Sequence, residues 1–230
     1  MQNKIFITNQ VEKVRRGDYT DFLDPNEEYQ VISILNKYNL KYNILKLFSD
    51  CEKTIIYKDK YPDISLLEIK CDTLLNHKDI LGALFSHNIN ISKYGDIVIK
   101  GKYYLPILNS IKPYILSNID TIGKNKVKID VVDIELISNY HYDYEEMNIL
   151  VSSLRIDNVV STLTNNSRNS VEELFKEKFV FINYLPVSKR TYILKENDII
   201  GIRRNGKYRF DSIVKVTNKE KFIIKIYKYK

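Results

Sequence analysis

Apolar residues recur along the chain with two periods, which predict alternating helices and strands. Residues 29–35 place their apolar side chains on one side of a helix that we expect to end near Asn39. Asp24 and Pro25 form a typical helix start, because Asp caps the first turn and Pro fits its first position. Strands at 66–69, 96–100 and 127–137 and helices at 77–87 and 107–119 follow in an order similar to β-α-β-β-α-β. That order predicts a small α/β domain of the split type.

The last third of the chain has a different pattern, with two short helices followed only by strands. Ser153 and Ser167 are expected to cap the two helices, and Asn165-Asn166 to form the turn between them. The strands are expected at 179–183, 199–203, 208–216 and 222–227, and Asn205-Gly206 predicts a hairpin with a two-residue turn. Residues 140–146 look like a polar, aromatic connector. We therefore expect domains at 1–63, 64–148 and 149–230.

Charge is distributed unevenly along the 230 residues. Residues 152–230 contain 17 Lys and Arg against 8 Asp and Glu, a net charge of +9, and the rest of the chain is at −2. Six of the eight arginines lie in that last third. Arg binds phosphate through two N–H groups and stacks on bases, so this enrichment favours a nucleic acid partner. Solvated faces of a small domain are the plainer alternative.

Candidate chemistry of an enzyme is sparse in this sequence. The three histidines and two cysteines have no metal-ligand spacing, and no glycine-rich phosphate loop is present. In His77-Lys78-Asp79 a carboxylate could orient an imidazole, although capping at a helix start explains the same residues. No apolar stretch has the length of a membrane span, and two cysteines suit a reducing cytoplasm. We expect a cytoplasmic protein without catalytic activity, cofactor, metal or membrane partner.

An ordered set of short motifs in the last third resembles the S-four domain, a small RNA-binding fold. The set comprises Arg155-Ile156-Asp157, Ser167-Arg168, Val180-Phe181-Ile182-Asn183 and Asn197-Asp198. Arg155 and Arg168 at two helix starts would place guanidinium groups and helix-terminal N–H groups on one side, which suits RNA phosphates. A local Arg155–Asp157 ion pair and a simple Ser167 cap are compatible alternatives.

Over most of its length the chain resembles the YlmH-type S-four proteins. The matching segments are 20–25, 77–82, 95–97 and 151–157. The resemblance implies an α+β fold with a small N-terminal α/β domain, a central RRM-like domain and a C-terminal S-four domain. It implies a bacterial cytoplasmic factor of ribosome-associated quality control. The implied partners are rRNA of the large subunit and tRNA, with other quality control factors as further candidates.

The candidate RNA-binding residues are cations of the last third together with Asn183 and one aromatic ring. They are Arg155, Arg168, Lys176, Lys178, Asn183, Tyr184, Arg190, Arg203, Arg204 and Lys207. Tyr192, Tyr208 and Phe210 are further rings on which bases could stack, although packing explains them equally.

Two other functions stay open at this point. An RNA-modifying enzyme, of the pseudouridine synthase or methyltransferase type, could use such a domain for targeting. It would need an additional catalytic motif, which residues 1–148 lack. A protein-interaction adaptor could use the basic domain only as an anchor.

Overall fold

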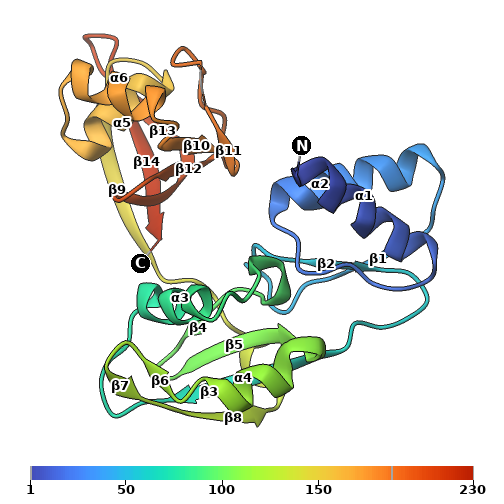
Figure 1. The fold of residues 1–230 in the computed structure, drawn as a ribbon. Coiled ribbons are helices and arrows are strands. Elements are labelled where there is room, and N and C mark those ends of the chain that lie inside the picture. Colours follow the sequence, from blue (N-terminus) through green and yellow to red (C-terminus); the bar gives the residue numbers. More distant parts are fainter. Residues whose placement is uncertain (1, 188, 230) are drawn as a thin grey trace. The chain divides into compact units, whose positions relative to one another are not determined.

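The computed structural model describes residues 2–187 and 189–229, except for the side chains of Gln2, Asn3 and Arg168. The described chain forms two compact units, residues 1–141 and 142–230 (Figure 1). Each unit has its own hydrophobic core. The fold is therefore mixed α+β, as predicted.

The first unit begins with a helical part and continues into a four-stranded sheet. The helical part comprises α1 (Gln2–Arg15), α2 (Pro25–Lys37), β1 (Asn43–Leu45) and β2 (Ile55–Tyr57). Next come β3 (Ile64–Lys70), α3 (His77–Ser86), β4 (Val98–Ile99), β5 (Tyr103–Leu108), α4 (Lys112–Asn118), β6 (Thr121–Ile122), β7 (Asn125–Lys126) and β8 (Lys128–Val132). Single turns of 3₁₀ helix lie at Ile91–Lys93, Asn109–Ile111 and Ile134–Ile137.

The four-stranded sheet has the order β4-β5-β3-β8, and every neighbouring pair is antiparallel. With α3 and α4 between the strands, this is the split β-α-β arrangement that the sequence predicted. The core lies between this sheet and the two helices, and contains Leu67, Ile80, Leu105 and Ile115.

The helix predicted at 107–119 begins too early, because Ile107 and Leu108 belong to β5 and Asn109–Ile111 form a 3₁₀ turn. Residues 103–108 form β5, and all six are buried in the middle of the sheet. A fully buried strand has no alternation of polar and apolar residues, so its pattern resembles that of a buried helix. The helix starts only at Lys112, next to Pro113, which fits a first turn. The strand predicted at 127–137 likewise ends at Val132, and Asp133 caps a 3₁₀ turn.

Residues of the segment 20–25 join the helical part to the sheet. Asp21 is buried and pairs with Lys13 at 2.8 Å and with Lys93 at 2.9 Å. Burial acts to raise the pKa of Asp21, but these two ammonium groups outweigh it and lower the pKa. The Phe22 ring packs over Gly95, where a Cβ atom would lie 2.9 Å from its Cε1 atom. Position 95 therefore needs a glycine because of close packing.

We expect Gly95→Ala to destabilise the first unit, because the added methyl group must displace a buried ring. Overpacking of this kind costs about 1–3 kcal/mol. Gly82→Ala is the matched control, since Gly82 lies in α3 with nothing within 4 Å of its missing Cβ. There alanine should stabilise the helix by about 0.5–1 kcal/mol. Chemical denaturation of both variants measures the difference, and equal stability would contradict the packing argument.

The second unit is a six-stranded antiparallel sheet with two helices. Its elements are β9 (Tyr144–Val151), α5 (Ile156–Thr164), α6 (Arg168–Lys176), β10 (Val180–Ile182), β11 (Leu185–Pro186), β12 (Ile199–Ile202), β13 (Gly206–Val216) and β14 (Phe222–Tyr229). The strand order is β11-β10-β12-β13-β14-β9. Both helices pack on one face of the sheet, where Ile156, Val160 and Phe175 meet Ile200 and Ile224 (Figure 1).

The edge strand β9 begins where the sequence predicted a connector. Eight residues from Tyr144 to Val151 pair with β14, and Met147, Ile149 and Val151 contact the core. The sequence placed the boundary at 148/149, whereas this pairing puts all of β9 in the second unit. Tyrosines and acids in the first half hide the strand signal, because the apolar residues begin only at Met147. The further division at 63/64 stays a prediction.

Candidate nucleic-acid interface

The start of α5 is held by a side chain from within the helix. Asn158 Oδ1 accepts hydrogen bonds from the backbone N–H groups of Ser152 and Ser153, at 2.9 and 3.4 Å. Arg155 occupies the N-cap position without a side-chain cap bond. The cap predicted at Ser153 is therefore wrong, because the first-turn Asn satisfies this loop instead.

Arg155 forms a two-pronged ion pair with Asp157. Its Nε and Nη2 atoms lie 3.1 and 2.6 Å from the two carboxylate oxygens. Burial acts to raise the pKa of Asp157, but the hydrogen bonds and charge of Arg155 outweigh it and lower the pKa. A guanidinium carries five N–H donors, so this pair orients Arg155 and leaves donors for a further anion. The ion pair predicted as an alternative is therefore present.

The second helix, α6, is capped as the sequence predicted. Ser167 Oγ accepts from the backbone N–H of Ser170 at 3.3 Å. Asn165 has a φ of 52°, the left-handed conformation that ends α5 in the expected turn. The candidate side chain of Arg168 lies outside the described residues.

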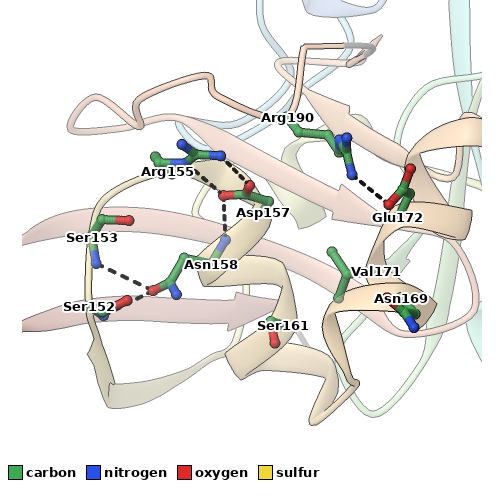
Figure 2. Close-up of a pocket in the computed structure, with 10 residues that line it drawn as sticks. All are labelled: Ser152, Ser153, Arg155, Asp157, Asn158, Ser161, Asn169, Val171, Glu172 and Arg190. Carbon is green, nitrogen blue, oxygen red and sulfur yellow. Dashed lines mark hydrogen bonds and ion pairs between the residues drawn. The ribbon is translucent and has the colours of Figure 1, made fainter.

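A cleft of about 450 Å³ lies between α5, α6 and the chain around Arg190. Figure 2 shows Arg155 and Arg190 at the same end of it, each beside its carboxylate. Arg190 Nη1 lies 3.0 Å from Glu172 Oε2, and Lys176 Nζ lies 3.3 Å from Glu172 Oε1. Hydrogen bonds from Lys176 and Arg190 lower the pKa of Glu172. The lining residues are Ser152, Ser153, Arg155, Asp157, Asn158, Ser161, Asn169, Val171, Glu172 and Arg190.

The β12–β13 hairpin forms a second group of cations. Ile202 pairs with Gly206, so Arg203, Arg204 and Asn205 form a three-residue loop. The predicted two-residue turn is wrong. Arg204 takes the left-handed conformation, with a φ of 66°, and Asn205 Oδ1 accepts from Tyr208 Oη at 2.6 Å.

One aromatic ring supports both loop arginines. The guanidinium groups of Arg203 and Arg204 lie 5.1 and 6.0 Å from the centre of the Phe179 ring. Lys178, directly before this ring, is exposed and has a φ of 56°. These three candidate cations therefore lie close to one ring at one end of the sheet. None of them forms an ion pair with a carboxylate among the described residues.

Asn183 has a structural role, because both ends of its amide are bound. It donates to Asp198 Oδ1 and accepts from the N–H of Ile199, each at 2.9 Å. The other oxygen of the buried Asp198 accepts from Tyr192 Oη at 2.9 Å. Asn183 and Asp198 thus link the end of β10 to the start of β12.

The candidate rings divide into packed and accessible ones. Tyr208 and Phe210 are buried in the core, and burial with the Asp198 contact raises the pKa of Tyr192 to about 12. Tyr184 is partly exposed, and Lys207 Nζ donates to its hydroxyl at 3.0 Å. Of the predicted rings, Tyr184 alone therefore stays a candidate for base stacking.

Sequence reasoning missed a group of side chains on the face of the sheet opposite α5 and α6. The group comprises Tyr144, Arg209, Tyr227 and Tyr229. The alternation of Lys225, Tyr227 and Tyr229 with apolar and charged neighbours along β14 is the signal that could have found it.

The earlier catalytic candidate is a helix cap. Asp79 accepts from the N–H of Asn76 at 2.8 Å, and Asn76 accepts from the N–H groups of Lys78 and Asp79. In the described part of the chain, no three His, Cys, Asp or Glu side chains form a group that could hold a metal ion. No helix among the described residues has the length and apolar character for crossing a membrane.

Fold and cleft together define a mixed α+β protein with a split β-α-β sheet and a separate, arginine-rich sheet unit. A family model described as "Putative RNA-binding domain in YlmH" matches residues 58–136. In this segment the chain is similar to the YlmH family.

Two known proteins are similar to the chain over a larger part of its length. The chain is 26% identical over 224 residues to the "Ribosome-associated protein quality control protein P2" of Bacillus subtilis, covering 92% of this chain and 87% of that protein. A solved structure, the cell division protein ylmH from Streptococcus pneumoniae, has a TM-score of 0.51 at 17% identity. It covers 60% of this chain and 96% of that one, and it supports the fold.

Proposed function

We propose that the protein is a non-enzymatic RNA-binding factor of the cytoplasm that acts in the rescue or quality control of stalled translation. Its targets are structured rRNA of the large ribosomal subunit and tRNA. The name of the Bacillus subtilis relative and the family description of residues 58–136 support this class of function.

The observation that carries the proposal is the cleft between α5 and α6. Arg155 and Arg190 line one end of it, and each is oriented by a carboxylate at 2.6 to 3.0 Å. Such pairs fix the direction of a guanidinium while leaving N–H donors, which suits contacts to RNA phosphates. Lys176 makes the cluster net positive, with three cations against Asp157 and Glu172.

The two units differ in charge, although less than the predicted boundary suggested. Residues 142–230 contain 17 basic and 11 acidic residues, a net charge of +6, and residues 1–141 have a net charge of +1. Asp143, Glu145 and Glu146 account for the change, and the two glutamates form ion pairs with Lys228 and Lys225 across the strands. The second unit still has the larger attraction for a polyanion.

The proposal is tested by sedimenting the full chain with separated ribosomal subunits and by identifying crosslinked RNA. We expect the protein to travel with the large subunit and to crosslink to rRNA and tRNA. Sedimentation with neither subunit, and no crosslinked RNA, would contradict it.

We further expect Arg155→Gln to weaken binding to large-subunit RNA by about 1–3 kcal/mol, because one charge-assisted contact is lost. Arg15→Gln is the matched control, since Arg15 also pairs with a carboxylate at 2.6 Å and is similarly exposed on α1. Filter binding measures both variants, and thermal melts show whether each still folds. Equal affinities of the two variants would remove Arg155 from the RNA site.

A further inference from the structure

The face of the second sheet opposite α5 and α6 carries aromatic and cationic side chains in cross-strand rows. In one row Phe181, Gly201 and Lys207 are register partners on β10, β12 and β13, and Tyr229 pairs with Tyr144 farther along. In the next row Arg209 pairs with Tyr227, whose partner on β9 is Glu146, and Glu146 forms an ion pair with Lys225. We call these residues, with Tyr142 and Tyr184, the open face. Side chains of register partners in neighbouring strands lie close enough to form a continuous surface.

The tyrosines of the open face form a connected cluster. Tyr144 has its ring centre 5.0 Å from that of Tyr229 and 5.9 Å from that of Tyr227, and Tyr142 lies 5.7 Å from Tyr229. The ring planes are inclined at 59° to 75°. Steeply inclined neighbours do not cover one another face to face, as parallel stacked rings would. All four rings are partly exposed.

Two cations lie within this cluster. The Arg209 guanidinium is 5.1 Å from the Tyr144 ring centre and 5.0 Å from that of Tyr227. Its Nε is buried without a hydrogen-bond partner among the described atoms. Lys207 Nζ lies 4.7 Å from the ring centres of both Tyr184 and Tyr229. The cations therefore sit over aromatic rings, where a planar group and a phosphate can be bound together.

We propose that the open face binds unpaired bases of RNA, which stack on the tyrosine rings and the Arg209 guanidinium. This inference rests on the proposed RNA-binding function and assigns it a second surface. Lys207 and the adjacent loop arginines, Arg203 and Arg204, provide positive charge for the connecting phosphates. Aromatic rings interleaved with cations are the usual combination for single-stranded nucleic acid.

The chemistry of the face favours unpaired bases over a double helix. In a duplex the base faces are stacked on one another, so a ring cluster offers them no contact. The other large sheet shows the contrast, because its face away from α3 and α4 carries Glu68 and Asp130, paired with Lys70 and Lys102. Tyr104, the ring next to Glu68 on that face, is buried.

The test compares the full-length chain with a double variant, Tyr144→Leu with Tyr227→Leu, which removes two rings and keeps the charge. The probes are an oligouridine RNA and an abasic oligomer of the same length, which has the phosphates but no bases. The matched control is Tyr57→Leu with Tyr61→Leu, a ring pair 5.4 Å apart in the first unit. A rescue variant, Tyr144→Phe with Tyr227→Phe, keeps both rings.

We expect the wild type to bind oligouridine at least about fivefold more tightly than the abasic oligomer, and the leucine variant to lose that difference. The phenylalanine and control variants should keep it. Equal binding of both oligomers by the wild type would overturn the inference, as would an unchanged preference in the leucine variant.

Photocrosslinking locates the contact without any substitution, so the inference stays testable if the leucine variant fails to fold. Oligouridine with 4-thiouridine should crosslink to peptides from 142–151 or 206–229. Crosslinks confined to α5, α6 or the first unit would overturn it. If large-subunit RNA binding still depends on Arg155 in that case, only the second surface is wrong. A chain that binds no RNA would contradict both proposals.

Discussion

A fragment of residues 142–230 should fold alone and retain most of the RNA affinity of the full chain, whereas residues 150–230 should lose the folded state. The shorter fragment lacks nearly all of β9, which pairs with β14 over eight residues. It also loses Met147 and Ile149 from the core. Burying one such side chain contributes about 1.5–3 kcal/mol, against a total stability of about 5–15 kcal/mol for a domain.

Thermal melts followed by circular dichroism measure the folding of the two fragments, and filter binding to large-subunit RNA measures their affinity. Residues 1–141, a compact unit at a net charge of +1, provide the comparison. That fragment includes residues 58–136, where the RNA-binding family model matches. If it bound RNA as tightly as the full chain, the first unit would be the main RNA-binding part.

The sequence correctly predicted secondary-structure elements that depend on interactions between neighbouring residues. The helix α2 begins where predicted, because Asp24 and Glu27 form reciprocal hydrogen bonds with each other's backbone. β5 failed because its role is set by distant partners. It pairs with β3 and β4, and the continuous apolar run in Tyr103–Leu108 does not by itself distinguish a buried strand from a buried helix.

The same distinction applies to the candidate site. The charge excess and the helix starts placed Arg155 and Arg190 in one unit, and the structure brings them into one cleft. The partner of Arg155 could be predicted from the sequence, because Asp157 lies only two residues away. The partner of Arg190 could not, because Glu172 lies on α6, far away along the chain. The open face depends on the register of β9 against β14. The number and spacing of tyrosines along the sequence do not reveal this register.

The segments that carry the family resemblance include residues with a packing role. Asp21 and Phe22 contact Lys93 and Gly95, and the Asp96 carboxylate accepts from the N–H groups of Glu52 and Lys53 at 2.7 and 3.0 Å. Lys53 donates to the carbonyl oxygens of Ile91 and Tyr94, and burial lowers its pKa to about 8. These motif residues therefore stabilise the contact between the helical part and the four-stranded sheet of the first unit.

We expect the double variant Arg203→Gln with Arg204→Gln to weaken RNA binding and to make it less dependent on salt. Both side chains lie on the three-residue loop and are exposed, so the substitution removes charge and leaves the pairing of Ile202 with Gly206. Each phosphate contact releases counterions, so the slope of log affinity against log salt should shrink by about 1.5 for two charges. Lys207 is kept, because it lies over Tyr184 and Tyr229 and its loss would also disturb the open face.

The control for this prediction removes the same charge from another hairpin of the same unit. Lys219 and Lys221 are exposed at the turn between β13 and β14, where the Thr217 N–H donates to the Lys221 carbonyl oxygen and the Lys221 N–H donates to Thr217 Oγ1. Lys219→Gln with Lys221→Gln therefore lowers the net charge equally at a different place. Filter binding to large-subunit RNA at three salt concentrations gives both slopes. If the two double variants show the same change, the overall charge of the unit matters and the β12–β13 loop is no specific contact. A smaller slope for the arginine variant alone locates phosphate contacts at that loop.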